Sequence, residues 1–436
     1  MSWQQRVKHR TAGRGVVHET RQLQFEELLH RRCAACHNED SAKGRYRLDT
    51  FARLLKPGES DLPPIVSRKP EESEVYLRLV EKGADDRMPQ KADALPAAEI
   101  AIVERWIREG AVMEGVEVDR PIVELARESL LHAAPEHYPR PLPVTALAFS
   151  PDSTQLAASG YGEVTIWNVA SGALVRRIGG LPERIHSLAW HPSRNVIAVA
   201  GGTPSQWGGV ALVDASVGFQ ARYLCDLAES ALSCAFSPDG SQLAVGGGDR
   251  TIRFFDTASG KQTRVLKQHA DWVQSVAFSP GGKLLVSASR DRTARIFDAA
   301  TGELESTYSE HETPLLAAVF SGENTVVSLA RGRSLNVWNA DKAERRAEYA
   351  DIANEVQTMV ASPFGLVTGS ADAAVRVYQF SDQHAIFTLP GHRDVVQSLA
   401  VAPSGEIFAS GSADGVVCVW SLACGTWISR FVASPM

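Results

Sequence analysis

The chain has 436 residues, with 45 Lys and Arg against 51 Asp and Glu, so its formal net charge is -6. This length exceeds the roughly 100 to 200 residues of one ordinary domain, and a hydrophobic content of 44% excludes a disordered or collagen-like chain. The lack of a basic excess argues against nucleic acid as a partner, and without a run of roughly 18 apolar residues we expect no transmembrane segment.

A basic segment opens the chain. Residues 1–21 carry Arg6, Lys8, Arg10 and Arg14, and no apolar stretch follows these charges. A secretory signal needs an apolar stretch of about 7 to 15 residues after its basic start. We therefore expect no export signal in the sequence as given.

The next segment, residues 22–32, is predicted to be a helix. Phe25, Leu28 and Leu29 are spaced so that they share one helical face and point into a core. The helix leads the chain directly into a cysteine motif.

Cys33, Cys36 and His37 form the string Cys-Ala-Ala-Cys-His immediately after this helix. On one helical turn, two thiols at this spacing can each add to a haem vinyl group while the adjacent imidazole reaches the iron. In a chain of 436 residues with 6 Cys and 12 His, chance alone gives about 0.002 such strings. The motif therefore predicts one covalently attached haem c.

A zinc site is the rival interpretation of the two thiols and the histidine. Structural zinc needs about four ligands. The other cysteines all lie far along the chain, at Cys225, Cys234, Cys418 and Cys424. We interpret these four as ordinary buried or turn thiols, so haem is favoured over zinc.

Only five methionines are available as a second iron ligand. Met1 and Met436 stand at the ends of the chain, and Met359 lies in a predicted strand. Met88 precedes the next predicted helix and Met113 follows it. We favour Met88 as the distal ligand, with Met113 or a second histidine as alternatives.

The second helix of this region is predicted over residues 96–109. Pro96 suits the first position of a helix, and Gly110 suits the position just after its end. Its apolar residues fall on one face: Ile100, Val103, Trp106 and Ile107.

Two helices that flank a haem, with the thiols on the first, are the plan of small monohaem cytochromes c. The intervening stretches resemble the planctomycete-type cytochrome c domain, a family often joined to WD-repeat propellers. The matching stretches are residues 44–50, 69–74 and 87–89, and the resemblance covers residues 22–112. It implies an all-α, class I-like cytochrome c fold in which Met88 occupies the distal ligand position.

A proline-rich linker is expected over residues 113–143, with a short helix at Val123 to His132. Its prolines are Pro121, Pro135, Pro139, Pro141 and Pro143. Their density near the end of the linker predicts an extended, stiff chain.

Seven copies of one sequence unit fill residues 144–436. Apolar runs recur at steps of 40 to 46 residues, beginning at Val144, Ile185, Ala231, Val273, Leu315, Val356 and Val396. A second series keeps the same period: Trp167, Val213, Phe255, Phe297, Trp338, Tyr378 and Trp420. Two independent series with one period indicate a repeat architecture.

Each copy reads as four antiparallel strands, with an Asp-centred tight turn before the third strand in most copies. This pattern resembles the WD-repeat β-propeller and implies seven blades. The family's buried His, Asp and Trp network is matched by His392, Asp414 and Trp420. Because each blade is complete in sequence, we expect no strand to cross between the first and seventh blades. Closure should therefore rest on packing between them.

These features favour a c-type monohaem cytochrome that carries single electrons and is docked by its propeller onto a redox partner protein. An interaction scaffold with a structural or redox-sensing haem is the alternative. We expect no enzymatic activity, since a haem peroxidase would need the iron position that Met88 fills. Covalent haem attachment implies a periplasmic or otherwise extracytoplasmic location.

Overall fold

The structure is a computed structural model of the chain. It describes residues 24–26, 28–29, 32–33, 36–37, 42–83, 85–90, 93–113, 117–124, 127, 131, 133–204, 206–216, 221–227, 229–349, 352, 354–381 and 384–435. The chain divides into two compact units, Met1–Leu130 and Leu131–Met436. This division falls inside the expected linker. None of the described helices is both long and apolar enough to span a membrane.

Helices of the N-terminal unit are short, apart from one. They are η1 (Lys43–Arg45), α3 (Phe51–Leu54), η2 (Pro70–Glu72), α4 (Glu74–Val80) and α5 (Ala97–Arg108). The described residues of the predicted first helix, 24–26, 28–29 and 32, are also helical. The chain between these elements is irregular, so the expected all-α class is not confirmed.

Helix α5 forms as its sequence predicts. Pro96 caps its N-terminus, and Gly110 after its end has a φ of +118°, a value that favours glycine. Val103, Trp106 and Ile107 are buried on one face. This face belongs to the single apolar core of the N-terminal unit.

Aromatic stacking and one ion pair join the predicted first helix to α5. The ring of Phe25 stacks on that of Trp106, with centroids 3.8 Å apart, and the edge of Phe51 meets the same indole at 6.0 Å. Arg32 makes a bidentate ion pair with Glu99, with both N···O distances at 2.9 Å. The segment that carries the cysteine motif is therefore fixed against α5.

The linker helix is only partly described. Residues 122–124 and 127 are helical, whereas residues 125–126, 128–130 and 132 lie outside the described residues. Residues 133–143 form neither helix nor strand, and they bond to the end of the chain. Tyr138 N donates to Pro435 O (2.9 Å), and Leu142 N donates to Ser434 Oγ (3.0 Å).

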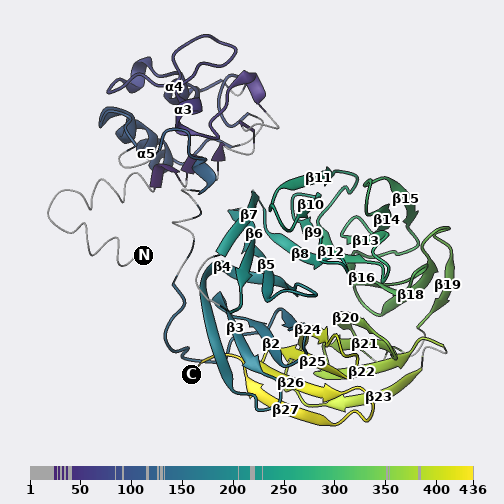
Figure 1. The fold of residues 1–436 in the computed structure, drawn as a ribbon. Coiled ribbons are helices and arrows are strands. Elements are labelled where there is room, and N and C mark those ends of the chain that lie inside the picture. The colour runs from purple at the N-terminus through teal and green to yellow at the C-terminus, as the bar shows by residue number, and fades with distance from the viewer. Residues whose placement is uncertain are drawn as a thin grey trace. The chain divides into compact units, whose positions relative to one another are not determined.

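The C-terminal unit contains seven blades that follow one another around a ring (Figure 1). Five are separate four-stranded sheets, and the first two share one long strand in a seven-stranded sheet. Blades 1 and 2 comprise β1 (Leu147–Phe149), β2 (Gln155–Ser159), β3 (Tyr161–Asn168), β4 (Leu174–Trp190), β5 (Val196–Thr203), β6 (Trp207–Asp214) and β7 (Ala221–Leu227). Blade 3 comprises β8 (Ala231–Phe236), β9 (Gln242–Gly247), β10 (Ile252–Asp256) and β11 (Gln262–Leu266). Blade 4 comprises β12 (Val273–Phe278), β13 (Leu284–Ser289), β14 (Ala294–Asp298) and β15 (Leu304–Tyr308).

The last three blades are also four-stranded sheets with their strands in sequence order. Blade 5 comprises β16 (Leu315–Gly322), β17 (Thr325–Ala330), β18 (Ser334–Asn339) and β19 (Arg345–Glu348). Blade 6 comprises β20 (Val356–Ser362), β21 (Gly365–Ser370), β22 (Ala374–Gln379) and β23 (Ala385–Pro390). Blade 7 comprises β24 (Val396–Val401), β25 (Ile407–Ser412), β26 (Val416–Ser421) and β27 (Trp427–Val432). Every member of the predicted aromatic series, including Val213, lies in a third strand.

Burial explains the sequence pattern within a blade. The second strands are buried along nearly their whole length, as in β21, because neighbouring blades cover both of their faces. They therefore read as continuous apolar runs. The fourth strands stand at the outer edge, and in β27 no residue is fully buried. The ladder is antiparallel throughout.

One strand departs from the expected separation of blades. Strand β4 is 17 residues long and continuous, and it pairs with β3 in blade 1 and with β5 in blade 2. The first two blades consequently form one seven-stranded sheet. Strand β1 also begins three residues later than the predicted run at Val144. The side chain of Ser159 accepts the backbone N–H groups of Thr145 and Ala146 there.

The seam between blades 1 and 7 is held by packing, as predicted. No described strand is shared across it, so strand pairing does not close the ring. Instead, Trp167 stacks on Phe431 with centroids 4.7 Å apart. Val144 N donates to Ser412 O (3.0 Å), and Ser398 Oγ donates to Val144 O (2.7 Å). One apolar cluster spans both blades.

Candidate functional site

Cys33, Cys36 and His37 lie on a single backbone turn that continues the first helix. Cys33 N donates to Leu29 O at 3.0 Å, as in an α-helix. The N–H groups of Cys36 and His37 both donate to the carbonyl of Cys33, at 3.1 Å each. The structure therefore brings the three motif residues together in the compact turn that haem attachment requires.

The ring of His37 is held by a backbone carbonyl. Its Nδ1 lies 3.2 Å from Tyr46 O. Because a carbonyl only accepts, Nδ1 carries the proton and Nε2 keeps its lone pair for a metal. Burial lowers the pKa of His37, which favours the neutral imidazole that ligation needs.

Tyr46 was not singled out from the sequence. Its hydroxyl donates to Leu54 O at 2.8 Å, and its ring meets that of His37 edge-on at 5.5 Å. These contacts fix the carbonyl that orients His37. Burial raises the pKa of the phenol, so the hydroxyl stays a donor. Only its place in the 44–50 stretch of the resemblance pointed to this residue.

The two motif cysteines are half-buried free thiols. Burial, together with the neighbouring Cys36, raises the pKa of the Cys33 thiol to about 12. The thiol is therefore protonated in the free protein. Among the described residues, no three His, Cys, Asp or Glu side chains stand close enough to hold a metal ion.

Met88 and Met113 border the same apolar core in different ways. Met88 is half-buried at its margin, and its backbone N–H donates to Arg78 O at 2.9 Å. Met113 is a fully packed member of the core, at 6% exposure. The partly exposed thioether of Met88 is accessible to a bound haem, whereas the thioether of Met113 is enclosed by the core.

The surroundings of the motif fit a haem. The macrocycle needs an apolar wall, an imidazole with a free Nε2 and two thiols within one turn. Cys33 and Met88 are partly buried against one apolar core, and other half-buried apolar side chains pack against the same core: Tyr46, Ile65, Val75, Tyr76, Ile100 and Ile102. The chain thus places the two thiols, the imidazole and a thioether in one small unit with an apolar margin.

The predicted network of His392, Asp414 and Trp420 is present but is centred on a serine that was not predicted. His392 Nε2 lies 2.7 Å from Ser410 Oγ, and Trp420 Nε1 donates to the same oxygen at 2.8 Å. His392 Nδ1 lies 3.8 Å from Asp414 Oδ1. Ser410 thus links His392 to Trp420, and Asp414 lies beside the histidine, so these four side chains stabilise the fold.

Related networks lie in blades 4 and 5. His311 Nε2 lies 2.7 Å from Ser328 Oγ, which also accepts from Trp338 Nε1 at 3.0 Å. In blade 4, His269 contacts Ser287 at 2.7 Å and its turn aspartate at 2.8 Å. Each serine stands ten residues before the third-strand aromatic. That fixed spacing is visible in the sequence and could have revealed them.

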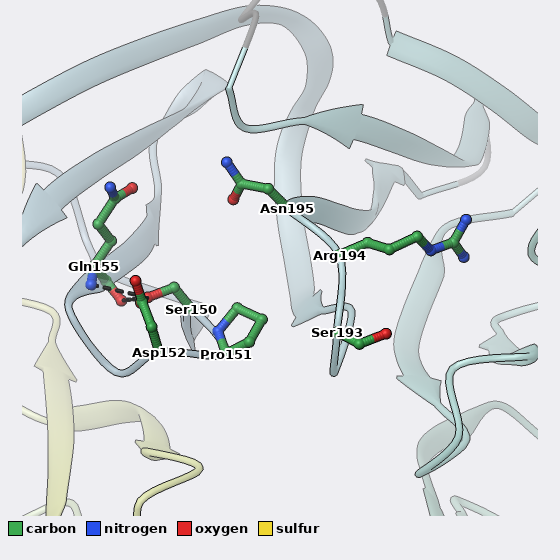
Figure 2. A pocket seen from close by; sticks show the side chains of 7 residues that line it. All are labelled: Ser150, Pro151, Asp152, Gln155, Ser193, Arg194 and Asn195. Atoms are coloured by element: carbon green, nitrogen blue, oxygen red, sulfur yellow. Dashed lines mark hydrogen bonds between the residues drawn. The ribbon is translucent and has the colours of Figure 1, made fainter.

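A shallow hollow of about 320 Å³ lies between the first turns of blades 1 and 2 (Figure 2). Asp152 on one side accepts from Ser150 Oγ (2.6 Å) and Thr154 Oγ1 (2.8 Å), which stabilises its own turn. Arg194 points out of the hollow and donates to Thr257 Oγ1 at 2.8 Å. The hollow is a gap between blades whose polar groups serve the fold.

Comparisons with known proteins match both parts of the chain. Residues 33–91 match the model of the family Planctomycete cytochrome C, and residues 130–168, 228–256, 260–298 and 383–421 match the model WD domain, G-beta repeat.

Two curated relatives share limited segments. The chain is 37% identical over 65 residues to the sterol regulatory element-binding protein cleavage-activating protein of Xenopus laevis, which is 15% of this chain and 5% of that protein. It is 32% identical over 71 residues to the small ribosomal subunit protein RACK1y of Oryza sativa subsp. japonica, which is 16% of this chain and 21% of that protein. The chain therefore spans only a small part of the length of either relative.

Proposed function

Because the chain joins a planctomycete-type cytochrome c domain to WD repeats, we propose that it is a monohaem c-type cytochrome that carries single electrons for a redox partner protein. The observation that carries the proposal is the turn of Cys33, Cys36 and His37, in which the His37 ring is fixed through Nδ1. The proposal gives the protein no catalytic turnover of its own.

Each residue of the site has a distinct part. Cys33 and Cys36 would hold the haem through two thioether bonds, His37 Nε2 would be the proximal ligand and Met88 the distal one. Bound haem supplies the one-electron couple of its iron. The bond from His37 Nδ1–H to Tyr46 O sets the ring orientation and raises the basicity of Nε2.

The propeller would position this redox unit against its partner. WD repeats suggest contacts with other proteins, and the four matched repeat segments support that role here. Covalent attachment of haem takes place outside the cytoplasm, so we place the mature protein in the periplasm or another extracytoplasmic compartment. The proposal includes this location.

Haem staining after denaturation tests the attachment. The full chain is expressed with a cytochrome c maturation system, run on a denaturing gel and weighed intact. We expect a coloured band and the added mass of one haem. The double variant Cys33→Ala with Cys36→Ala should show neither the coloured band nor the added mass. Cys424→Ala, which changes an exposed turn thiol, should show both. Quantitative extraction of haem by acidified organic solvent would overturn the proposal.

A redox titration separates electron transfer from a purely structural haem. We expect one reversible one-electron step in the loaded protein, with the same midpoint in both directions. A haem that cannot be reduced and reoxidised without loss of the fold would favour the scaffold function instead.

A further inference from the structure

The tight turns before the third strands of blades 3, 4 and 5 carry exposed arginines that the other blades lack. They are Arg250, Arg290, Arg292, Arg331 and Arg333, here called the arginine arc. The same turns of blades 6 and 7 carry only small residues at the flanking positions, namely Ala371, Ala373, Ala413 and Gly415.

All five arginines lie on one face of the propeller. In an antiparallel sheet successive turns alternate between its two ends, so the turn before the third strand shares a face with the loop before the first strand. Backbone bonds of 2.9 Å join them, from Gly248 N to Ser230 O and from Arg290 N to Trp272 O. Blades 3, 4 and 5 are consecutive around the ring, and shared apolar clusters pack them together (Figure 1).

The two carboxylates within these turns, Asp249 and Asp291, have other partners. Asp249 pairs with Arg253 at 2.7 Å in its own blade. Asp291 is bonded to His269 Nδ1 at 2.8 Å and to Thr293 Oγ1 at 2.6 Å. These contacts stabilise the turns and leave the flanking guanidinium groups facing solvent.

The arc is therefore a set of exposed basic side chains in consecutive turns. Among the described residues, the side chains of Arg250, Arg292, Arg331 and Arg333 form no ion pair or hydrogen bond. Arg290 is 3.9 Å from Asp271 Oδ2 and lies over the half-buried ring of Trp272, 4.5 Å from its centroid. Residues 141–436 as a whole carry 22 basic against 27 acidic side chains, whereas the three turns of the arc carry five arginines against the partnered Asp249 and Asp291.

Two of the arginines occupy a backbone conformation that suits glycine. Arg250 has a φ of +70° and Arg292 a φ of +68°, and Gly415 fills the equivalent position of blade 7 with a φ of +77°. A side chain in this region carries a backbone penalty that glycine avoids. Arginine is therefore present at these turns despite the local backbone preference.

We propose that the arginine arc docks a carboxylate-rich surface of a protein partner. Guanidinium groups bind carboxylates in a bidentate manner, and the Trp272 ring beneath Arg290 adds an aromatic contact of the kind enriched at protein interfaces. The inference rests on the proposed function and deepens it, because it gives the redox partner an acidic docking face. Complementary charges of this kind also raise the rate of association, because they attract the partner before contact.

Peptide binding by the full chain tests the arc. The probe is a fluorescein-labelled peptide of ten glutamates, titrated by anisotropy at low salt, with a ten-glutamine peptide as its neutral counterpart. The variant is Arg250→Gly combined with Arg292→Gly, which removes two positive charges and the backbone penalty of a positive φ in both turns. We expect binding of the glutamate peptide to weaken about three- to tenfold, and the wild-type affinity to fall as salt is added.

A matched variant removes two positive charges from the opposite face. Lys261 and Lys283 are exposed in the turns there, so Lys261→Ala with Lys283→Ala should bind the glutamate peptide like wild type. Thermal unfolding should show that the glycine variant is at least as stable as wild type. Equal affinity in the glycine variant and wild type would overturn the proposal. Tighter binding of a heparin fragment or duplex DNA of equal charge at the arc would overturn it as well. Haem content, measured on the same samples, tests the proposed function separately.

Discussion

Tyr138 donates a 2.6 Å hydrogen bond to Oε1 of Glu163, a carboxylate that is only 1% exposed. Oε2 of Glu163 pairs with Arg177 Nε at 2.8 Å. Arg177 also donates to the backbone carbonyls of Pro135 and Glu136. The end of the linker is therefore bound to blade 1 through an ion pair whose carboxylate is buried.

Loss of this anchor should destabilise blade 1. Glu163→Gln leaves Arg177 without its counter-charge, and we expect the free energy of unfolding to fall by about 2 to 3 kcal/mol. Tyr138→Phe removes one hydrogen bond but keeps the ion pair, so a loss of about 1 kcal/mol is expected. Urea unfolding measures both. Limited proteolysis should also cleave residues 135–143 faster in each variant; unchanged cleavage would show that the linker is held by other contacts.

The stability of the propeller should fall in mild acid because of His311. Burial and the nearby Arg345 lower the pKa of His311 to about 4 in the folded protein. The unfolded chain takes up the proton near pH 6.5, so this contribution is present above that pH and is lost as pH falls toward 4. We expect His311→Gln to reduce the difference in unfolding free energy between pH 7.5 and 4.5 by about 2 to 3 kcal/mol. An identical pH dependence in the variant would refute the assignment.

Methionine substitution should separate the ligand from the core residue. In the haem-loaded protein, Met88→Ala should abolish the long-wavelength sulfur-to-iron band of the oxidised form and lower the midpoint potential. Met113→Ala should keep the band while costing about 2 to 4 kcal/mol of stability, because Met113 is buried in the core. The reverse pattern of spectra would transfer the ligand role to Met113.

Ser410 should matter more than its size indicates. Ser410→Ala removes the hydroxyl that contacts His392 Nε2 and accepts from Trp420 Nε1, and leaving two buried polar groups unpaired should cost about 2 to 4 kcal/mol. Thr368 stands ten residues before Tyr378 in blade 6, and its buried Oγ1 has no hydrogen-bond partner among the described residues. Thr368→Val should therefore leave stability unchanged or raise it. Equal losses in the two variants would contradict the network.

The repeats and the haem motif could be predicted because their evidence is contiguous or periodic in the sequence. Seven similar copies average out local irregularities, and Cys33 to His37 are neighbours along the chain. The partner of His37 could not be found in this way, because it is the backbone carbonyl of Tyr46, and a carbonyl has no residue identity. Which carbonyl reaches the His37 ring depends on how residues 42–48 fold back over the motif.

Other features depend on tertiary placement. Glu163 reads as an ordinary polar residue of a strand, and only the fold sets it between Arg177 and Tyr138. The end of the linker expected over residues 113–143 is bound to the propeller, and this too depends on contacts between segments far apart in the sequence. The all-α fold class was predicted from two helices with clear sequence patterns. Residues 55–69, between α3 and η2, form no helix or strand.

The unbroken course of β4 through blades 1 and 2 has a mechanical consequence. Elsewhere a loop connects successive blades and can absorb strain, but here a displacement of one blade is transmitted to the next through a single strand that is paired in both. A single-molecule pulling experiment should therefore register these two blades as one unfolding event of double length. In the same way, duplication or excision of a single blade could occur anywhere from blade 3 onward, but it would cut through a paired strand if it fell between the first two.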